Sequence, residues 1–221
     1  EVGSIALAQP GSLVLALEHG FARLDLGSGE VHSIAPVAHP KPPMRLNDAK
    51  VDASGRLWFG SLNHGDESQP DGRLYRWDAG RAPVEVDAGY CVANGPTFSA
   101  DGRTMFHTDS VRATVYAYDL AGDGALSGKR ARLTFGADEG YPDGMTTDAQ
   151  GRIWIAHWSQ ACVTCHDPVT ATVLHTLTLD APLIRDLYYR SQQMVLDLPG
   201  YAAGNFTTDD VRAHSWWRIE N

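Results

Sequence analysis

The sequence has few cysteines, no long apolar run and little positive charge. Its 221 residues include three cysteines, a small and odd number that argues against a disulfide framework and favours a reducing, cytoplasmic compartment. No apolar stretch approaches the ~20 residues of a membrane-spanning helix. Lysine and arginine number 18 against 27 acidic residues, a net charge of −9. This balance favours neither nucleic acid nor a membrane as a partner.

Helix-period patterns are also scarce until the end of the chain. The 22 glycines and 12 prolines punctuate short alternating apolar runs. Asp-Gly, Ser-Gly and Asn-Gly dipeptides, which are typical of turns, separate these runs. The sequence therefore predicts an all-β fold.

Four segments share one pattern, a tight turn that ends in glycine and is followed by an apolar or alternating strand. They are LAQPGSLVLAL (7–17), VDASGRLWFGS (51–61), FSADGRTMFHT (98–108) and TDAQGRIWIAH (147–157). Successive turn glycines lie 44, 47 and 49 residues apart. A repeat of this length with about four short antiparallel strands is typical of a β-propeller blade. We therefore expect four propeller blades, with a β-sandwich as the alternative.

The repeat also aligns three polar residues. The position eight residues before each turn glycine holds Asn47, Asn94 and Asp143 in three consecutive units, and Gly3 in the first. In a propeller this position lies at the start of the innermost strand, and innermost strands of neighbouring blades converge on the central channel. Three oxygen-bearing side chains there would suit a hard divalent cation. The alternative is that each dipeptide, such as Asn94-Gly95, only forms a turn.

At these residues the chain resembles the SMP-30/gluconolactonase/regucalcin family. The matching strings are RLNDAKVDASGRLWFGS, VANGPTFSADGRTMFHTDS and GYPDGMTTDAQGRIWIAHW, and the resemblance covers about residues 1–182. It implies a six-bladed propeller that hydrolyses sugar lactones with one divalent metal ion in its channel. It further implies that Asn94 and Asp143 are metal ligands and that Arg45 and Asn47 contact the substrate.

Two departures from the family pattern stand out. The E-G-P-x-W segment, which supplies the family's first metal ligand, is absent, and neither Glu1 nor Glu18 matches it. Glu67 lies near a substrate-contacting Glu of some members, but its loop does not align firmly.

The second departure is the C-terminal end of the chain. We expect one propeller domain over residues 1–182 and a divergent tail over 183–221. The channel closes with fewer blades, the tail substitutes for a blade, or the chain is a fragment whose partner supplies the rest; an open sheet edge would favour a homodimer.

These observations lead to two functional hypotheses. The first is metal-dependent, gluconolactonase-like hydrolysis of a sugar lactone, with a cation (Ca, Zn, Mg, Mn or Fe) that polarises the carbonyl and activates water. Asp143 is the only charged member of the aligned set and is the predicted general base. Arg45 and Asn47 would bind lactone oxygens. The second hypothesis is a metal-binding regulatory propeller with little catalysis.

One further motif would indicate a different kind of protein, one that binds haem. Residues 162–166 read C-x-x-C-H, the spacing of c-type haem attachment. The repeat instead places this segment in the second long strand of a blade, where alternate side chains face opposite sides. Cys162, Thr164 and His166 would share one face, and Val163 and Cys165 the other. We expect strand composition, not haem binding.

Overall fold

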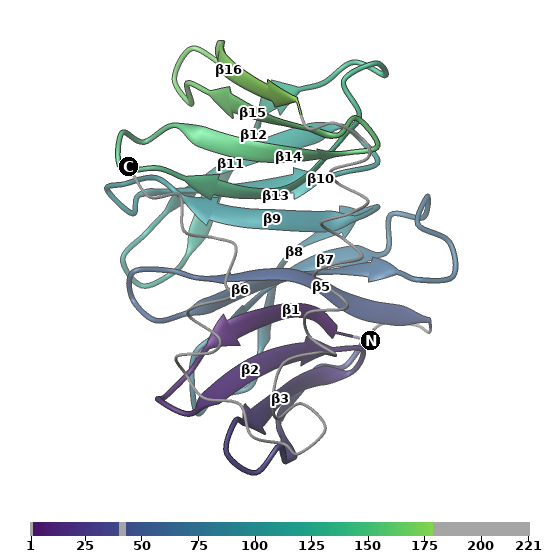
Figure 1. Cartoon of the computed structure of the whole chain (residues 1–221), viewed down its shortest axis with the longest axis vertical. Helices are drawn as coiled ribbons and strands as arrows, with labels where there is room; N and C mark the ends of the chain where they lie inside the picture. Colours follow the sequence, from purple (N-terminus) through teal and green to yellow (C-terminus); the bar gives the residue numbers. More distant parts are fainter. Residues whose placement is uncertain (1, 40–42, 179–221) are drawn as a thin grey trace.

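The structure is a computed structural model that describes residues 2–39 and 43–178. These residues form sixteen strands in four four-stranded sheets (Figure 1). Within each sheet the strands follow the order of the chain and pair antiparallel. This is the predicted arrangement of four blades in an all-β chain. In the described part no helix is long and apolar enough to cross a membrane.

The blades contain the following strands. Blade 1 comprises β1 (Val2–Leu7), β2 (Ser12–Leu17), β3 (Gly20–Asp25) and β4 (Val31–Pro36). Blade 2 comprises β5 (Met44–Val51), β6 (Leu57–Asn63), β7 (Gly72–Trp77) and β8 (Val84–Tyr90). Blade 3 comprises β9 (Ala93–Phe98), β10 (Thr104–Asp109), β11 (Thr114–Leu120) and β12 (Leu126–Thr134). Blade 4 comprises β13 (Tyr141–Thr147), β14 (Ile153–Trp158), β15 (Cys162–His166) and β16 (Val173–Thr178).

The repeated turn glycines connect the first two strands of each blade. Gly11, Gly55, Gly102 and Gly151 have φ values of 84°, 79°, 67° and 80°. A positive φ of this size is unfavourable for residues with a Cβ atom, which explains why glycine recurs at this point of each unit. The repeat in the sequence is therefore the turn between the first and second strands.

The first strands β1, β5, β9 and β13 lie side by side in that order along the middle of the molecule (Figure 1). Apolar side chains fill the space between neighbouring blades. Phe21 of blade 1 packs edge-on against Phe59 of blade 2, with ring centroids 4.7 Å apart. Trp58 contributes to the core between blades 2 and 3, and Ile155 to that between blades 3 and 4. Three apolar interfaces between consecutive blades thus hold the four described sheets together.

The C-x-x-C-H segment forms β15, as the blade register predicts. His166 Nε2 lies 2.8 Å from Thr164 Oγ1, so these two side chains share a face of the strand. Cys165 is buried, and neither it nor Cys162 is in a disulfide. The predicted tail, residues 183–221, lies outside the described residues.

Candidate functional site

The polar positions found by the eight-residue offset lie at β-bulges. In blade 2, Asn47 and Asp48 together oppose one residue of β6, because Leu46 pairs with Ser61 and Ala49 with Phe59. The first strand of each of the other three blades is irregular at the corresponding place. A bulge inserts an extra residue and turns a side chain out of the regular alternation. The offset in the sequence therefore marks a recurring distortion of the innermost strands.

In blade 4 the bulge contains Asp143 and Gly144, and in blade 3 it contains Gly95 and Pro96, immediately after Asn94. Gly95 has a φ of +47°, and a Cβ atom there would lie 2.5 Å from the carbonyl oxygen of Asp143. Only glycine allows this close approach of β9 and β13. The approach brings Asn94 and Asp143 together across the two blades.

Asn94 and Asp143 contact each other directly. Asn94 Nδ2 donates to Asp143 Oδ1 and, at 3.3 Å, to Ser110 Oγ. Asn94 Oδ1 accepts the Gly95 N–H at 3.0 Å, which leaves one lone pair of this oxygen for another partner. Burial raises the pKa of the Asp143 carboxyl, against the opposing hydrogen bonds from Asn94 and the Gly144 N–H.

Arg45 and Asn47 form a second pair in blade 2. Arg45 Nη1 donates to Asn47 Oδ1 at 2.9 Å, and Asn47 Nδ2 donates to the carbonyl oxygen of Ala93 at 3.0 Å. The amide of Asn47 is therefore oriented from both ends. Because Ala93 directly precedes Asn94 in β9, this bond also fixes the position of Asn47 relative to Asn94.

Asp48 is a further carboxylate beside Asn94 and Asp143, which the eight-residue offset does not select. Its Oδ2 accepts the Gly95 N–H at 3.1 Å, and its Oδ1 accepts the Ala49 N–H at 2.9 Å. Burial raises the pKa of its carboxyl to about 6, and the charge of Asp143 adds to the rise, against the effects of the Ala49 N–H and Lys50. In the sequence, the one indication of a role for Asp48 is its position directly after Asn47.

Asp109, the last residue of β10, and Ser110, the residue after it, hold Asn94 in place. The buried carboxylate of Asp109 accepts the Cys91 N–H at 3.0 Å. It therefore holds the segment that leads into β9, while Ser110 bonds the Asn94 amide. Neither role is readable from residue type alone, because both depend on the pairing of β9 with β10.

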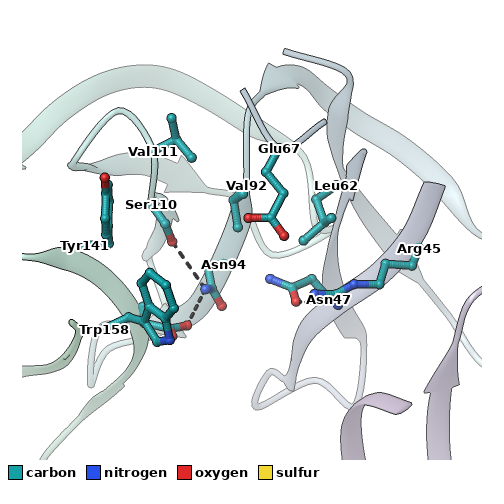
Figure 2. A pocket seen from close by; sticks show the side chains of 11 residues that line it. Arg45, Asn47, Leu62, Glu67, Val92, Asn94, Ser110, Val111, Tyr141 and Trp158 are labelled. Atoms are coloured by element: carbon teal, nitrogen blue, oxygen red, sulfur yellow. Dashed lines mark hydrogen bonds between the residues drawn. The ribbon is translucent and has the colours of Figure 1, made fainter. Parts of the chain in front are cut away.

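The four predicted site residues line a cleft of about 420 Å³. It is lined by Arg45, Asn47, Leu62, Glu67, Val92, Asn94, Ser110, Val111, Tyr141, Asp143 and Trp158. All four predicted site residues thus face the same space. In Figure 2, Arg45, Asn47 and Glu67 lie on one side, Tyr141 and Trp158 on the other, and Asn94 between them. The structure therefore brings Glu67, which the sequence could not assign, into the cleft.

The donors at the base of this cleft suit a hard cation. They combine the partly buried carboxylate of Asp143 with the amide oxygen of Asn94. A second partly buried carboxylate, Asp48, lies close enough for the charge of Asp143 to raise its pKa. Oxygen donors of this kind are the ligands of Ca²⁺ and Mg²⁺. Within residues 2–39 and 43–178, no three His, Cys, Asp or Glu side chains are grouped to hold a metal ion. A cation here would therefore depend on amide oxygens as well as on carboxylates.

The four blades identify the protein as a β-propeller, and its candidate site is a cleft lined by residues of the innermost strands. Residues 1–185 match the SMP-30/Gluconolactonase/LRE-like region. The chain belongs to this family.

Three relatives show how far the similarity extends. Regucalcin of Xenopus laevis is 33% identical over 186 residues, which are 80% of this chain and 61% of the relative. The pentonolactonase XacC of Haloferax volcanii is 33% identical over 126 residues, or 57% of this chain and 42% of the relative. The crystal structure of a calcium-binding regucalcin from Agrobacterium tumefaciens superposes with a TM-score of 0.74 at 22% identity, covering 81% of this chain and 60% of that chain.

The chain thus spans about three fifths of the length of these two regucalcins. The superposition shows the family's six-bladed propeller fold over the four described blades. The superposition covers 60% of the regucalcin from Agrobacterium tumefaciens.

Proposed function

We propose that this chain hydrolyses a sugar lactone with the help of a divalent cation held by Asn94 and Asp143. The observation that supports this most is the clustering of Arg45, Asn47, Asn94 and Asp143 in one cleft through bulges of neighbouring inner strands. The family also includes a pentonolactonase, with which this chain shares 33% identity over 126 residues.

The polar side of the cleft would bind and orient the substrate. Arg45 and Asn47 present N–H donors and an amide oxygen, which suit the hydroxyl groups of a sugar and the negative charge that develops on oxygen during ester cleavage. The fixed amide of Asn47 reduces the entropy lost on binding, because Arg45 and the Ala93 carbonyl already hold it.

Asp143 would act on the attacking water. Its carboxylate accepts a proton as the water oxygen bonds to the lactone carbonyl carbon, and it returns that proton to the ring oxygen as the ring C–O bond breaks. The partial burial that raises its pKa makes it a stronger base than an exposed carboxylate. A divalent cation bound by Asn94 and Asp143 would supply Lewis-acid polarisation of the carbonyl and a lowered pKa of bound water.

The proposal is tested with the full chain, freed of metal with EDTA and then loaded with Ca²⁺, Zn²⁺, Mn²⁺, Mg²⁺ or Fe²⁺. Proton release from gluconolactone and from a pentonolactone is compared with spontaneous opening. We expect turnover with at least one metal, and a loss of about 100-fold or more in Asp143→Asn, because a general base contributes 10²–10⁴-fold. Asp101→Asn, an exposed acid in the blade 3 turn, is the matched control.

Metal binding without turnover would favour the second candidate, a regulatory metal-binding propeller. Calorimetric titration of Ca²⁺ into the wild type and Asp143→Asn separates the outcomes. Turnover that is unchanged in Asp143→Asn would contradict the proposed site.

A further inference from the structure

Two aromatic side chains form the side of the cleft opposite the polar residues. We propose that Tyr141 and Trp158 are a stacking platform that binds the C–H face of the lactone ring and so selects cyclic sugar substrates. This inference rests on the proposed function, since it assigns a binding role within the same cleft.

The pair is built by strand register. Tyr141 opens β13 and pairs with Trp158, the last residue of β14. Their ring centroids lie 5.9 Å apart with the planes tilted by 43°. Side chains directly opposite each other on antiparallel strands pack together, so the two rings form one surface rather than two separate contacts.

Both rings remain open to solvent. Trp158 is 67% exposed and Tyr141 is 44% exposed, whereas Trp58, Tyr90 and Tyr118 are buried between the blades. Large exposed apolar side chains that border a concave polar site are a feature of binding surfaces. Tyr141 lies two residues before Asp143 on the same strand, so a ring held on this surface would lie next to the proposed general base.

A sugar lactone has the two kinds of surface that the cleft provides. Its hydroxyl groups and carbonyl point outward from the ring, while the ring C–H groups form an apolar face. Arg45, Asn47 and Glu67 on one side offer hydrogen bonds, and the rings of Tyr141 and Trp158 on the other offer apolar area (Figure 2). Aromatic rings bind an apolar face through burial and dispersion.

The experiment compares ring removal with ring conservation in the full chain, loaded with the most active metal. Trp158→Ala and Tyr141→Ala are each set beside the corresponding Phe variant. For the Ala variants we expect KM for gluconolactone, and the Kd of its non-hydrolysable lactam by calorimetry, to rise about 3- to 10-fold, the range of one aromatic contact. The kcat should change less than KM. The Phe variants should retain most of the affinity, and Tyr141→Phe should match the wild type.

A spectroscopic measurement separates binding from a merely structural role. Lactam binding should shift the tryptophan emission of the wild type, and Trp158→Phe should lose this shift while it still binds. Val169→Ala is the surface control, since Val169 is 81% exposed in blade 4 and does not line the cleft. Melting temperatures verify that all variants fold.

The outcomes are distinguishable. Unchanged KM and Kd in both Ala variants would overturn the platform but leave the lactonase proposal intact, as would a fall in kcat alone. A wild type that hydrolyses neither gluconolactone nor a pentonolactone, and does not bind the lactam, would overturn both proposals together.

Discussion

At the scale of single residues, His107 is a buried histidine without a hydrogen-bond partner among the described residues. It is fully buried, and its ring lies edge-on to Tyr90 with centroids 4.8 Å apart. Desolvation lowers the pKa of His107 to about 3, helped by the charge of Lys129 and opposed by that of Asp87. The folded protein therefore keeps this ring neutral well below the ordinary histidine pKa of ~6.5.

This burial predicts a pH dependence of stability. Below pH ~6.5 the unfolded chain binds a proton at His107 and the folded chain does not, until the pH reaches about 3. The contribution of the neutral His107 to the free energy of unfolding is therefore fully present above the unfolded pKa. It is lost as the pH falls below that value, by up to ~1.4 kcal/mol per pH unit. Urea unfolding at pH values from 7 to 4 should show a shallower loss in His107→Leu.

The neighbouring Phe106→Leu is the control for this measurement. Phe106 is buried on the same strand but does not titrate, so its substitution should lower stability equally at every pH. A pH slope in His107→Leu as steep as in the wild type would assign the acid sensitivity to other groups.

The residue scale also shows what the sequence can and cannot predict about the site. The offset of eight identified Asn47, Asn94 and Asp143, because the bulges recur at a fixed distance from each turn. Tyr141 and Trp158 were missed as a pair, because only the register of β13 with β14 brings them together. Glu67 lies in a loop outside the repeat, where no periodic signal exists.

At the scale of elements, two of the blade turns are held by the same side-chain arrangement. In blade 2, Asp52 Oδ1 accepts the Arg56 N–H at 3.0 Å, and its Oδ2 accepts Arg56 Nε at 2.6 Å and Trp58 Nε1 at 2.8 Å. Asp148 makes the same set of bonds in blade 4, to Arg152 and Trp154. The pattern D-x-x-G-R-x-W thus links the turn to the strand that follows it.

Removal of these carboxylates should destabilise the two blades unequally. Asp52 has 3% of its side chain exposed and Asp148 has 20%. Asp52→Ala leaves the buried Arg56 and the indole N–H of Trp58 without this acceptor. It should lower the free energy of unfolding by about 2–4 kcal/mol, against about 1–2 kcal/mol for Asp148→Ala. Chemical denaturation of the two variants provides the measurement.

Asp101→Ala is the control at the corresponding turn of blade 3. Asp101 is exposed and accepts bonds from Ser99 and Arg103 without an indole partner, so its replacement should have the smallest effect of the three. Equal losses in all three variants would show that the turn itself, and not the buried bonds, determines the stability. The turns were predictable from glycine and spacing, but the shared carboxylate required side-chain geometry.

At the scale of the whole molecule, blades 2 and 3 are connected by a polar cluster as well as by apolar packing. Asp87 Oδ2 of β8 accepts the hydroxyl of Tyr90 at 2.6 Å, the hydroxyl of Tyr118 on β11 at 2.5 Å and Nζ of Lys129 on β12 at 2.7 Å. Lys129 Nζ also lies 4.4 Å from the centroid of the Tyr90 ring. Burial tends to raise the pKa of Asp87, but the bonds from Lys129 and the two tyrosines lower it to about 2.

This cluster should couple the unfolding of the two blades. Asp87→Asn removes the charge that Lys129 and both tyrosines share, and should lower the free energy of unfolding by about 1–3 kcal/mol. Because the lost bonds run between blades, amide hydrogen exchange should accelerate on both sides, in β8 and in β11 and β12. Glu85→Gln is the control, since Glu85 lies on the same strand but pairs with Arg73 inside blade 2. A surface pair of this kind contributes little, so faster exchange in blade 3 of Glu85→Gln would contradict the assigned coupling.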